Sequence, residues 1–161
     1  MRHRTSGGSP LTSARNRHGL TGLLTRMRGH AFVVILDLDH FKVYNDTFGH
    51  LAGDQVLADF AAMLARESRH TDMVIRYGGE EFLVILSEVN PVTAEQIMQR
   101  WRTTWGRHPS GTTFSGGMTD LDGDHALARA DLSLYAAKAA GRARTITDLS
   151  TSSPLTSVSD R

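Results

Sequence analysis

The chain has no cysteine among its 161 residues, so disulfide bridges and thiolate metal sites are excluded. It also has no long apolar run: the stretch 31–36 is far short of the roughly 20 residues that a membrane-spanning helix needs. Residues 1–10 lack the apolar core of a secretory signal peptide. A net charge of +1 gives no electrostatic case for a nucleic acid or a membrane surface as partner. We therefore expect a cytoplasmic protein with no membrane segment and no nucleic-acid partner.

What is present is the composition of one globular domain, with 40% apolar and 22% charged residues. Residues 1–15 are rich in Arg, Ser and Gly, and residues 149–161 are mostly Ser and Thr. Segments of this kind bury too little apolar surface to order themselves. The composition predicts a disordered N-terminal segment at 1–15, a folded domain at 16–148 and a disordered tail at 149–161.

Apolar periodicity predicts helices alternating with strands along the folded part. Strand-like runs lie at residues 31–36, 73–75, 82–86, 112–118 and 143–147. Helical spacing is found at residues 20–27, from 54 onward, after the Asn90-Pro91 cap and at 124–140, with a loop or short helix at 41–50. Gly141 is placed as the residue that ends the last helix. This order predicts an α/β (α+β) fold, in which helices pack on a single mixed sheet.

Four carboxylates lie where this fold turns. Asp37 and Asp39 follow the first buried strand at i and i+2, so they share one face if the strand continues, or cap the turn that follows. Glu80 and Glu81 follow a Gly-Gly pair that predicts a tight hairpin, because glycine tolerates positive φ. Adjacent carboxylates repel each other unless a positive charge lies beside them, and a divalent metal carrying phosphates supplies one.

The hairpin turn, residues 78–82, resembles the signature of the GGDEF family, the diguanylate cyclases, in its GGEEF spelling. Residues 39–54 match the family's second motif, of the form DxFKxxNDxxGHxxGD, at every fixed position. Residues 130–143 resemble the closing ADxALYxAKxxGRN stretch, with Ser133 for Ala and Ala143 for Asn. The resemblance covers about residues 18–147.

Three other stretches depart from the family pattern. The opening DxLTGLxNR has His18 for Asp and Thr25 for Asn, and residues 115–118 read SGGM where the family has SxGV. The span from the hairpin to that strand is short, so we expect a loop or small strand to be missing there.

The order strand, helix, hairpin, helix, strand is similar to a ferredoxin-like sheet of the kind found in nucleotidyl cyclases and polymerase palms. In that arrangement the end of the first strand and the hairpin tip lie side by side, so Asp37 and Glu80 converge. The resemblance to the GGDEF family implies that Asp37, the Leu38 carbonyl and Glu80 bind Mg²⁺ or Mn²⁺, and that Asp39 is structural. Glu80 first and Glu81 second are the candidates for the catalytic proton acceptor, and the sequence leaves that choice open.

The family's substrate is GTP, and the resemblance assigns six residues to it. Asn45 and Asp54 suit guanine, because a carboxylate accepts from N1–H and the 2-amino group. His50 lies near them, with a capping or core-edge role as its alternative. The phosphates fall to Lys42, Lys138 and Arg142, although a cation at the end of a helix can also complement the helix dipole.

An RxxD pair upstream of the hairpin, Arg69 and Asp72, resembles the family's inhibitory site for the product, cyclic di-GMP. Arg100 on the next helix is the candidate for a second arginine of that site. As a bare pattern RxxD arises by chance, and its alternative is a surface ion pair in the loop before a strand.

The predicted function is the condensation of two GTP into cyclic di-GMP and two pyrophosphates. A homodimer is required, because one domain holds half of the catalytic site. The first alternative is a catalytically silent domain that binds cyclic di-GMP or GTP as a receptor. The retained carboxylates argue against it. The second alternative is a different nucleotidyl cyclase or a polymerase-like enzyme. Asn45 and Asp54 argue against it, because they favour guanine.

Overall fold

The computed structural model describes residues 19–24, 27, 30–121 and 125–150. The predicted segment 1–15 and all but two residues of the predicted tail lie outside the described residues, so these boundaries stay predictions. Ser150, inside the predicted tail, donates hydrogen bonds from its backbone N–H (2.9 Å) and its hydroxyl (2.8 Å) to Asp120. Within the described ranges, no helix is both long and apolar enough to cross a bilayer.

Five strands form one mixed sheet. They are β1 (Ala31–Leu38), β2 (Met73–Arg76), β3 (Glu81–Ser87), β4 (Phe114–Asp120) and β5 (Thr145–Asp148). Their order is β2-β3-β1-β4-β5, with β1 in the centre and antiparallel to both neighbours, and with β5 parallel to β4. Every residue of β1 is buried, as the apolar run 31–36 predicted. The predicted mixed sheet with helices packed on it is thus confirmed.

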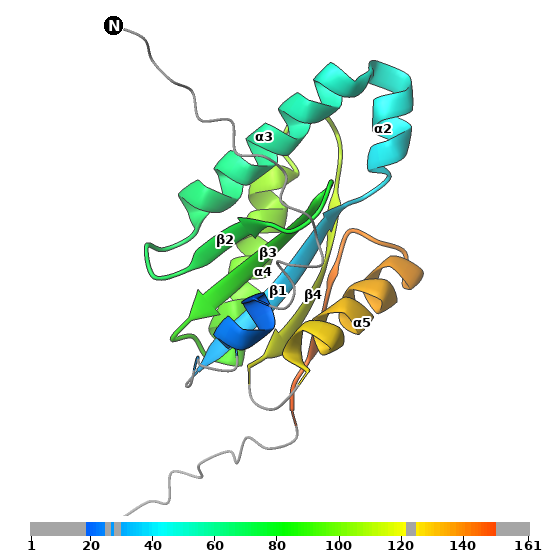
Figure 1. Ribbon diagram of the computed structural model, residues 1–161. Helices are drawn as coiled ribbons and strands as arrows, with labels where there is room; N and C mark the ends of the chain where they lie inside the picture. The colour runs from blue at the N-terminus through cyan, green and yellow to red at the C-terminus, as the bar shows by residue number, and fades with distance from the viewer. Residues whose placement is uncertain (1–18, 25–26, 28–29, 122–124, 151–161) are drawn as a thin grey trace, which may run out of the picture.

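Helices cover both faces of the sheet. They are α2 (Phe41–Phe48), α3 (His50–Glu67), α4 (Pro91–Trp105), α5 (Ala126–Ala139) and a short helical stretch at 19–24. Figure 1 shows α5 and the short helix in front of the sheet and α4 behind it. Because side chains alternate along a strand, Val34 and Leu36 of β1 enter the core under α3 and α4, whereas Val33 and Ile35 enter the core under α5.

The helix boundaries refine the sequence prediction at one place and confirm it at another. The stretch 41–50, predicted as a loop or short helix, contains α2 and then Gly49, whose φ of 88° breaks the chain direction before α3 begins at His50. Asn90 caps α4 as predicted, since its Oδ1 accepts from the N–H of Thr93 at 2.8 Å. The short connection 106–113 between α4 and β4 is described throughout and contains no strand.

Gly117 lets α5 lie directly on β4. A Cβ at this position would stand 2.0 Å from the Ala130 carbonyl oxygen and 2.3 Å from the Leu134 amide nitrogen. Both atoms belong to the α5 backbone, which cannot step aside as a flexible side chain can. The second glycine of the SGGM stretch therefore sets the distance between α5 and the sheet.

The C-terminal end of α5 is fixed by hydrogen bonds to the backbone beyond it. Gly141 has φ 111° and donates to Lys138 O (3.3 Å), while Arg142 N–H donates to Ala137 O (3.0 Å), which together form a Schellman motif. The glycine predicted to end the helix has this role. The next two residues, Arg142 and Ala143, are also left-handed, with φ 64° and 49°.

Asp39 connects this segment to the central strand. Its carboxylate is 4% exposed and accepts hydrogen bonds from the hydroxyls of Thr113 and Ser115, both at 2.6 Å, and from the Ala143 backbone N–H at 3.0 Å. The acceptor therefore joins the end of β1, the start of β4 and the loop after α5, as expected for a structural residue.

We predict that Gly117→Ala lowers the free energy of unfolding by about 1–3 kcal/mol or more, because the new methyl group overlaps the α5 backbone. Urea unfolding measures the loss. Gly79→Ala is the matched control, since a Cβ there meets nothing within 4 Å, and it should change stability by less than about 0.5 kcal/mol. Equal effects of the two substitutions would contradict the close approach.

We also predict that Ala143→Gly and Ala143→Asn raise the free energy of unfolding by about 0.5–1 kcal/mol. A left-handed alanine costs about 1–2 kcal/mol, which glycine avoids in part and asparagine tolerates. Thermal unfolding of the variants measures the gain. Ala139→Gly, in the exposed last turn of α5, should change stability in the opposite direction, because glycine weakens a helix interior. A destabilised Ala143→Gly protein would contradict the strain.

Candidate active site

The candidate site is formed where the end of β1, the β2–β3 turn, α2 and the C-terminal end of α5 meet, at the upper right of Figure 1. Asp37 lies next to last in β1 and pairs in register with Glu81 of β3 and with Ser115 of β4. It is 4% exposed. The strand therefore does continue to Asp37, and a carboxylate is buried at the end of the central strand.

Half of the Asp37 carboxylate is satisfied. Its Oδ2 accepts from the Lys138 ammonium at 2.6 Å, and this ion pair joins β1 to α5. Its Oδ1 is buried and receives no hydrogen bond from the described residues. A buried carboxylate oxygen without a donor is costly unless another positive group reaches it.

Glu80 stands beside this carboxylate. Burial first, and then the charge and hydrogen bonding of Asp37, raise the pKa of Glu80 to about 6. Lys138 acts in the opposite direction, and Glu81 adds a smaller upward contribution. The predicted convergence of Asp37 and Glu80 is therefore present, with Lys138 as the nearby cation.

The turn that carries Glu80 is held by its own backbone and by Arg76. The N–H groups of Tyr77 and Gly78 donate to Glu81 O at 2.8 and 3.1 Å. The Arg76 guanidinium donates to Gly78 O (3.3 Å) and Gly79 O (2.7 Å). Arg76 was not predicted as a site residue, although its place near the Gly-Gly pair was a usable signal.

The reason for the Gly-Gly pair differs from the expected one. Neither Gly78 nor Gly79 has left-handed φ. A Cβ on Gly78 would instead lie 2.7 Å from a carboxylate oxygen of Glu81. Glycine at position 78 therefore makes room for an acidic side chain, and the explanation from positive φ was wrong.

The residues predicted to read guanine lie at the junction of α2 and α3. Asn45 Oδ1 is buried without a hydrogen bond from the described residues, and it approaches Gly53 so closely that a Cβ there would stand 1.7 Å away. Asp54 follows Gly53 and lines a groove of about 540 Å³ between α3 and the hairpin, together with Leu57 and Arg76. The groove has the size of a ligand pocket, with apolar walls and a few polar groups.

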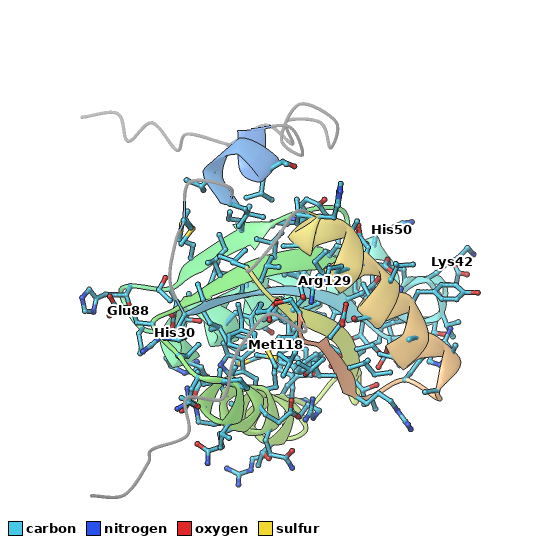
Figure 2. The ribbon with its side chains drawn as sticks, turned by 90° about the horizontal axis from the view of Figure 1, so that it is seen from below. His30, Lys42, His50, Glu88, Met118 and Arg129 are labelled. Carbon is cyan, nitrogen blue, oxygen red and sulfur yellow. The ribbon has the colours of Figure 1, made fainter. Side chains whose placement is uncertain are left out.

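Lys42 and His50 are exposed at this same end of the molecule, opposite His30 and Glu88, as Figure 2 shows. Lys42 Nζ lies 2.8 Å from Asp46 in an exposed i, i+4 ion pair. His50 is the first residue of α3. The structure thus brings Lys138 to Asp37 but leaves Lys42 on its own helix.

The RxxD residues form a partly buried turn rather than a loose surface pair. Asp72 has a side chain only 2% exposed, which accepts from the Arg69 backbone N–H at 2.8 Å, from its guanidinium at 2.9 Å and from Ser87 N–H at 3.2 Å. The Arg69 guanidinium also donates to Ser87 O. Arg100 bonds to the backbone and side chain of Glu67 (2.9 and 3.4 Å), at the end of α3. Both arginines remain about half exposed.

The residues present fit a divalent metal ion. No group of three or more His, Asp or Glu side chains in the described part of the chain is arranged to hold one alone. Mg²⁺ needs no such group, because it is typically held by one or two carboxylates with substrate phosphates and waters. Asp37 Oδ1 receives no hydrogen bond from the described residues, and burial beside Asp37 disfavours the Glu80 charge, so a divalent cation would stabilise both groups.

Comparison with known proteins agrees with this geometry. Residues 10–144 match the family described as diguanylate cyclase, GGDEF domain. The diguanylate cyclase DgcP of Pseudomonas aeruginosa is 39% identical over 153 residues, which cover 84% of this chain and 23% of that protein. The response regulator PleD of Caulobacter vibrioides is 37% identical, over 82% of this chain and 34% of PleD. The chain thus spans about a quarter to a third of these relatives.

Solved structures of similar sequence have the same fold. The GGDEF domain of DgcB from Caulobacter crescentus, in complex with c-di-GMP, superimposes with a TM-score of 0.73 at 27% identity, covering 91% of this chain and 98% of that one. The active GGEEF domain of a diguanylate cyclase from Vibrio cholerae gives a TM-score of 0.70 at 30% identity, with coverages of 80% and 89%. This chain belongs to the GGDEF-domain family of diguanylate cyclases.

Proposed function

We propose that this domain is a diguanylate cyclase, which condenses two GTP into cyclic di-GMP and two pyrophosphates. The observation that carries the proposal is the buried Asp37 carboxylate, with an oxygen that lacks a donor, beside Glu80 at the end of the central strand. A silent domain has no need to keep two mutually repelling carboxylates at this place. The relatives named diguanylate cyclases support the same chemistry.

Asp37, the Leu38 carbonyl and Glu80 would hold Mg²⁺ or Mn²⁺, which when bound neutralises phosphate charge and makes the attacking hydroxyl more acidic. Lys138 and Arg142, at the end of α5, contribute positive charge for the triphosphate. Lys42 adds a point charge from α2, since its exposed pair with Asp46 is weak. Glu80, or Glu81 beside it, accepts the proton of the attacking 3′-hydroxyl.

Guanine recognition falls to the α2–α3 junction. Asp54 faces the groove and suits the N1–H and 2-amino donors of guanine, whereas adenine would leave it unsatisfied. Asn45 of α2 offers both a donor and an acceptor, and His50 lies at the start of α3, the helix that carries Asp54. GTP as substrate places the proposed activity in the cytoplasm.

The reaction joins two GTP molecules, so we propose that two copies of the domain face each other as a homodimer. The Arg69, Asp72 and Arg100 surface is proposed as a product site. The complex of the similar DgcB domain with c-di-GMP supports a cyclic dinucleotide as ligand.

GTP turnover by the purified chain with Mg²⁺, measured across protein concentration with the product identified by mass, tests the function. The rate should rise more steeply than linearly, because only a dimer is active. Absence of product at high concentration, with cyclic di-GMP still bound, would instead make the domain a receptor.

We predict that Asp37→Asn and Glu80→Gln each reduce turnover at least about 100-fold, because each removes a proposed metal ligand. The two variants should also lose the rise in unfolding temperature that Mg²⁺ with GTP gives the unchanged chain. Glu88→Gln removes an exposed carboxylate at the opposite end of the sheet and should retain both properties. A fully active variant at position 37 or 80 would overturn the metal assignment.

Arg100→Ala should weaken cyclic di-GMP binding about 10-fold or more, because an arginine–phosphate contact is charge-assisted. Arg100 tests the site better than Arg69, whose removal would also deprive the buried Asp72 of its partner. Isothermal titration calorimetry measures the affinity. Arg66→Ala is the control, since Arg66 also pairs with Glu67 and is similarly exposed. Unchanged affinity in Arg100→Ala would remove this residue from the product site.

A further inference from the structure

A second cavity, separate from the groove beside Asp54, lies between the end of α4, the start of β4 and the segment that follows α5. Its volume is about 210 Å³, which is below the range of drug-sized ligand sites. Trp105 and Phe114 supply aromatic walls, Thr113 a hydroxyl group, and Arg102 a charge. Neither the predicted metal site nor any predicted GTP residue lines it.

The indole ring of Trp105 is a rigid part of the cavity lining. Trp105 is 3% exposed, and its Nε1–H has no hydrogen-bond partner among the described residues. The ring is held in place from two sides, edge-on by Phe60 at 4.9 Å and stacked by His108 at 4.2 Å between ring centroids. The indole nitrogen is itself buried, so Trp105 offers a ligand its ring rather than its N–H.

The charge of the cavity is positive. Arg102 is the one ionisable side chain among its lining residues, all of which belong to the described part of the chain. The guanidinium is anchored by hydrogen bonds to Thr145 Oγ1 (2.6 Å) and to Gln99 (3.2 Å), and its exposure is 22%. Glu95 meets it at 3.5 Å but is half exposed and does not line the cavity. The cation is therefore pre-positioned and only weakly neutralised.

We propose that this cavity binds a small planar carboxylate, with its ring against Trp105 and Phe114 and its carboxylate within reach of Arg102. An aromatic acid matches both the flat apolar walls and the single cation. The cavity volume restricts the ligand to one ring or its equivalent.

The cavity shares its wall with the candidate active site. Thr113 and Ala143 line it, and both donate hydrogen bonds to Asp39, two residues from Asp37. Ala143 also follows Arg142, in the left-handed segment after α5. A ligand in the cavity thus contacts the segment that carries Arg142, whether or not the proposed cyclase reaction takes place.

Benzoate is a suitable probe, and ¹H–¹⁵N correlation spectra of the full 161-residue chain are a suitable readout. Benzoate should shift the Trp105 indole and Ala143 amide resonances saturably, at millimolar concentration. The indole of Trp101, which is also buried and unpartnered but does not line the cavity, is the internal control and should not move. Benzyl alcohol, with the same ring and no charge, should bind at least about 10-fold more weakly.

Arg102→Gln should weaken benzoate binding by a similar factor and leave benzyl alcohol unchanged. Arg107→Gln, an exposed arginine outside the cavity, should bind benzoate as the unchanged chain does. Equal affinity for benzoate and benzyl alcohol, shifts at Trp101 instead of Trp105, or no saturable shift would overturn the proposal. The comparison of benzoate with benzyl alcohol uses the unchanged chain, so it tests the proposal even if Arg102→Gln does not fold. None of these measurements involves GTP turnover. A failure of the cavity proposal can therefore be distinguished from a failure of the proposed cyclase function.

Discussion

The burial of the Asp37 carboxylate at the end of the central strand is the constraint on which the rest of the site depends. A buried carboxylate is costly unless it is paired, and removal of the partner leaves a charge without compensation. Lys138 pairs with one oxygen, but it lies on α5, on the other side of the sheet from α3 and α4. The position of α5 is therefore an electrostatic requirement of β1 as well as a packing requirement.

Two backbone features fix that position. Gly117 permits α5 to lie against β4 without side-chain thickness between them. At the other end of the site, Asp39 collects three donors, one of them the Ala143 backbone N–H. This hydrogen bond and the preceding Schellman motif stabilise the two consecutive left-handed residues, Arg142 and Ala143, against their backbone strain. The segment after α5 is thus determined by contacts from β1, far away in the sequence.

The sequence predicted the elements well, because a strand buried on both faces and amphipathic helices leave strong apolar patterns. It also predicted that Asp37 and Glu80 converge, because the order of elements brings the first strand beside the hairpin. The explanation of Gly78 was wrong, since the glycine makes room for a side chain three residues later. The roles of Arg76 and Gly117 were missed. For Arg76 the nearby Gly-Gly pair was a usable signal, because its acceptors are the carbonyls of these two glycines. Gly117 depends on α5 backbone atoms that come close only after folding, and no local pattern reports such an approach.

The lysines predicted to bind phosphate differ in the ion pair that each must break in order to bind it. Lys42 is held by an exposed i, i+4 ion pair, an interaction that solvent screens and that a triphosphate can replace at small cost. Lys138 is held by a buried carboxylate, so it can leave Asp37 only if another cation compensates that charge. In the proposed reaction the divalent metal is that cation. The same carboxylate therefore makes phosphate binding by Lys138 depend on the metal, while phosphate binding by Lys42 does not.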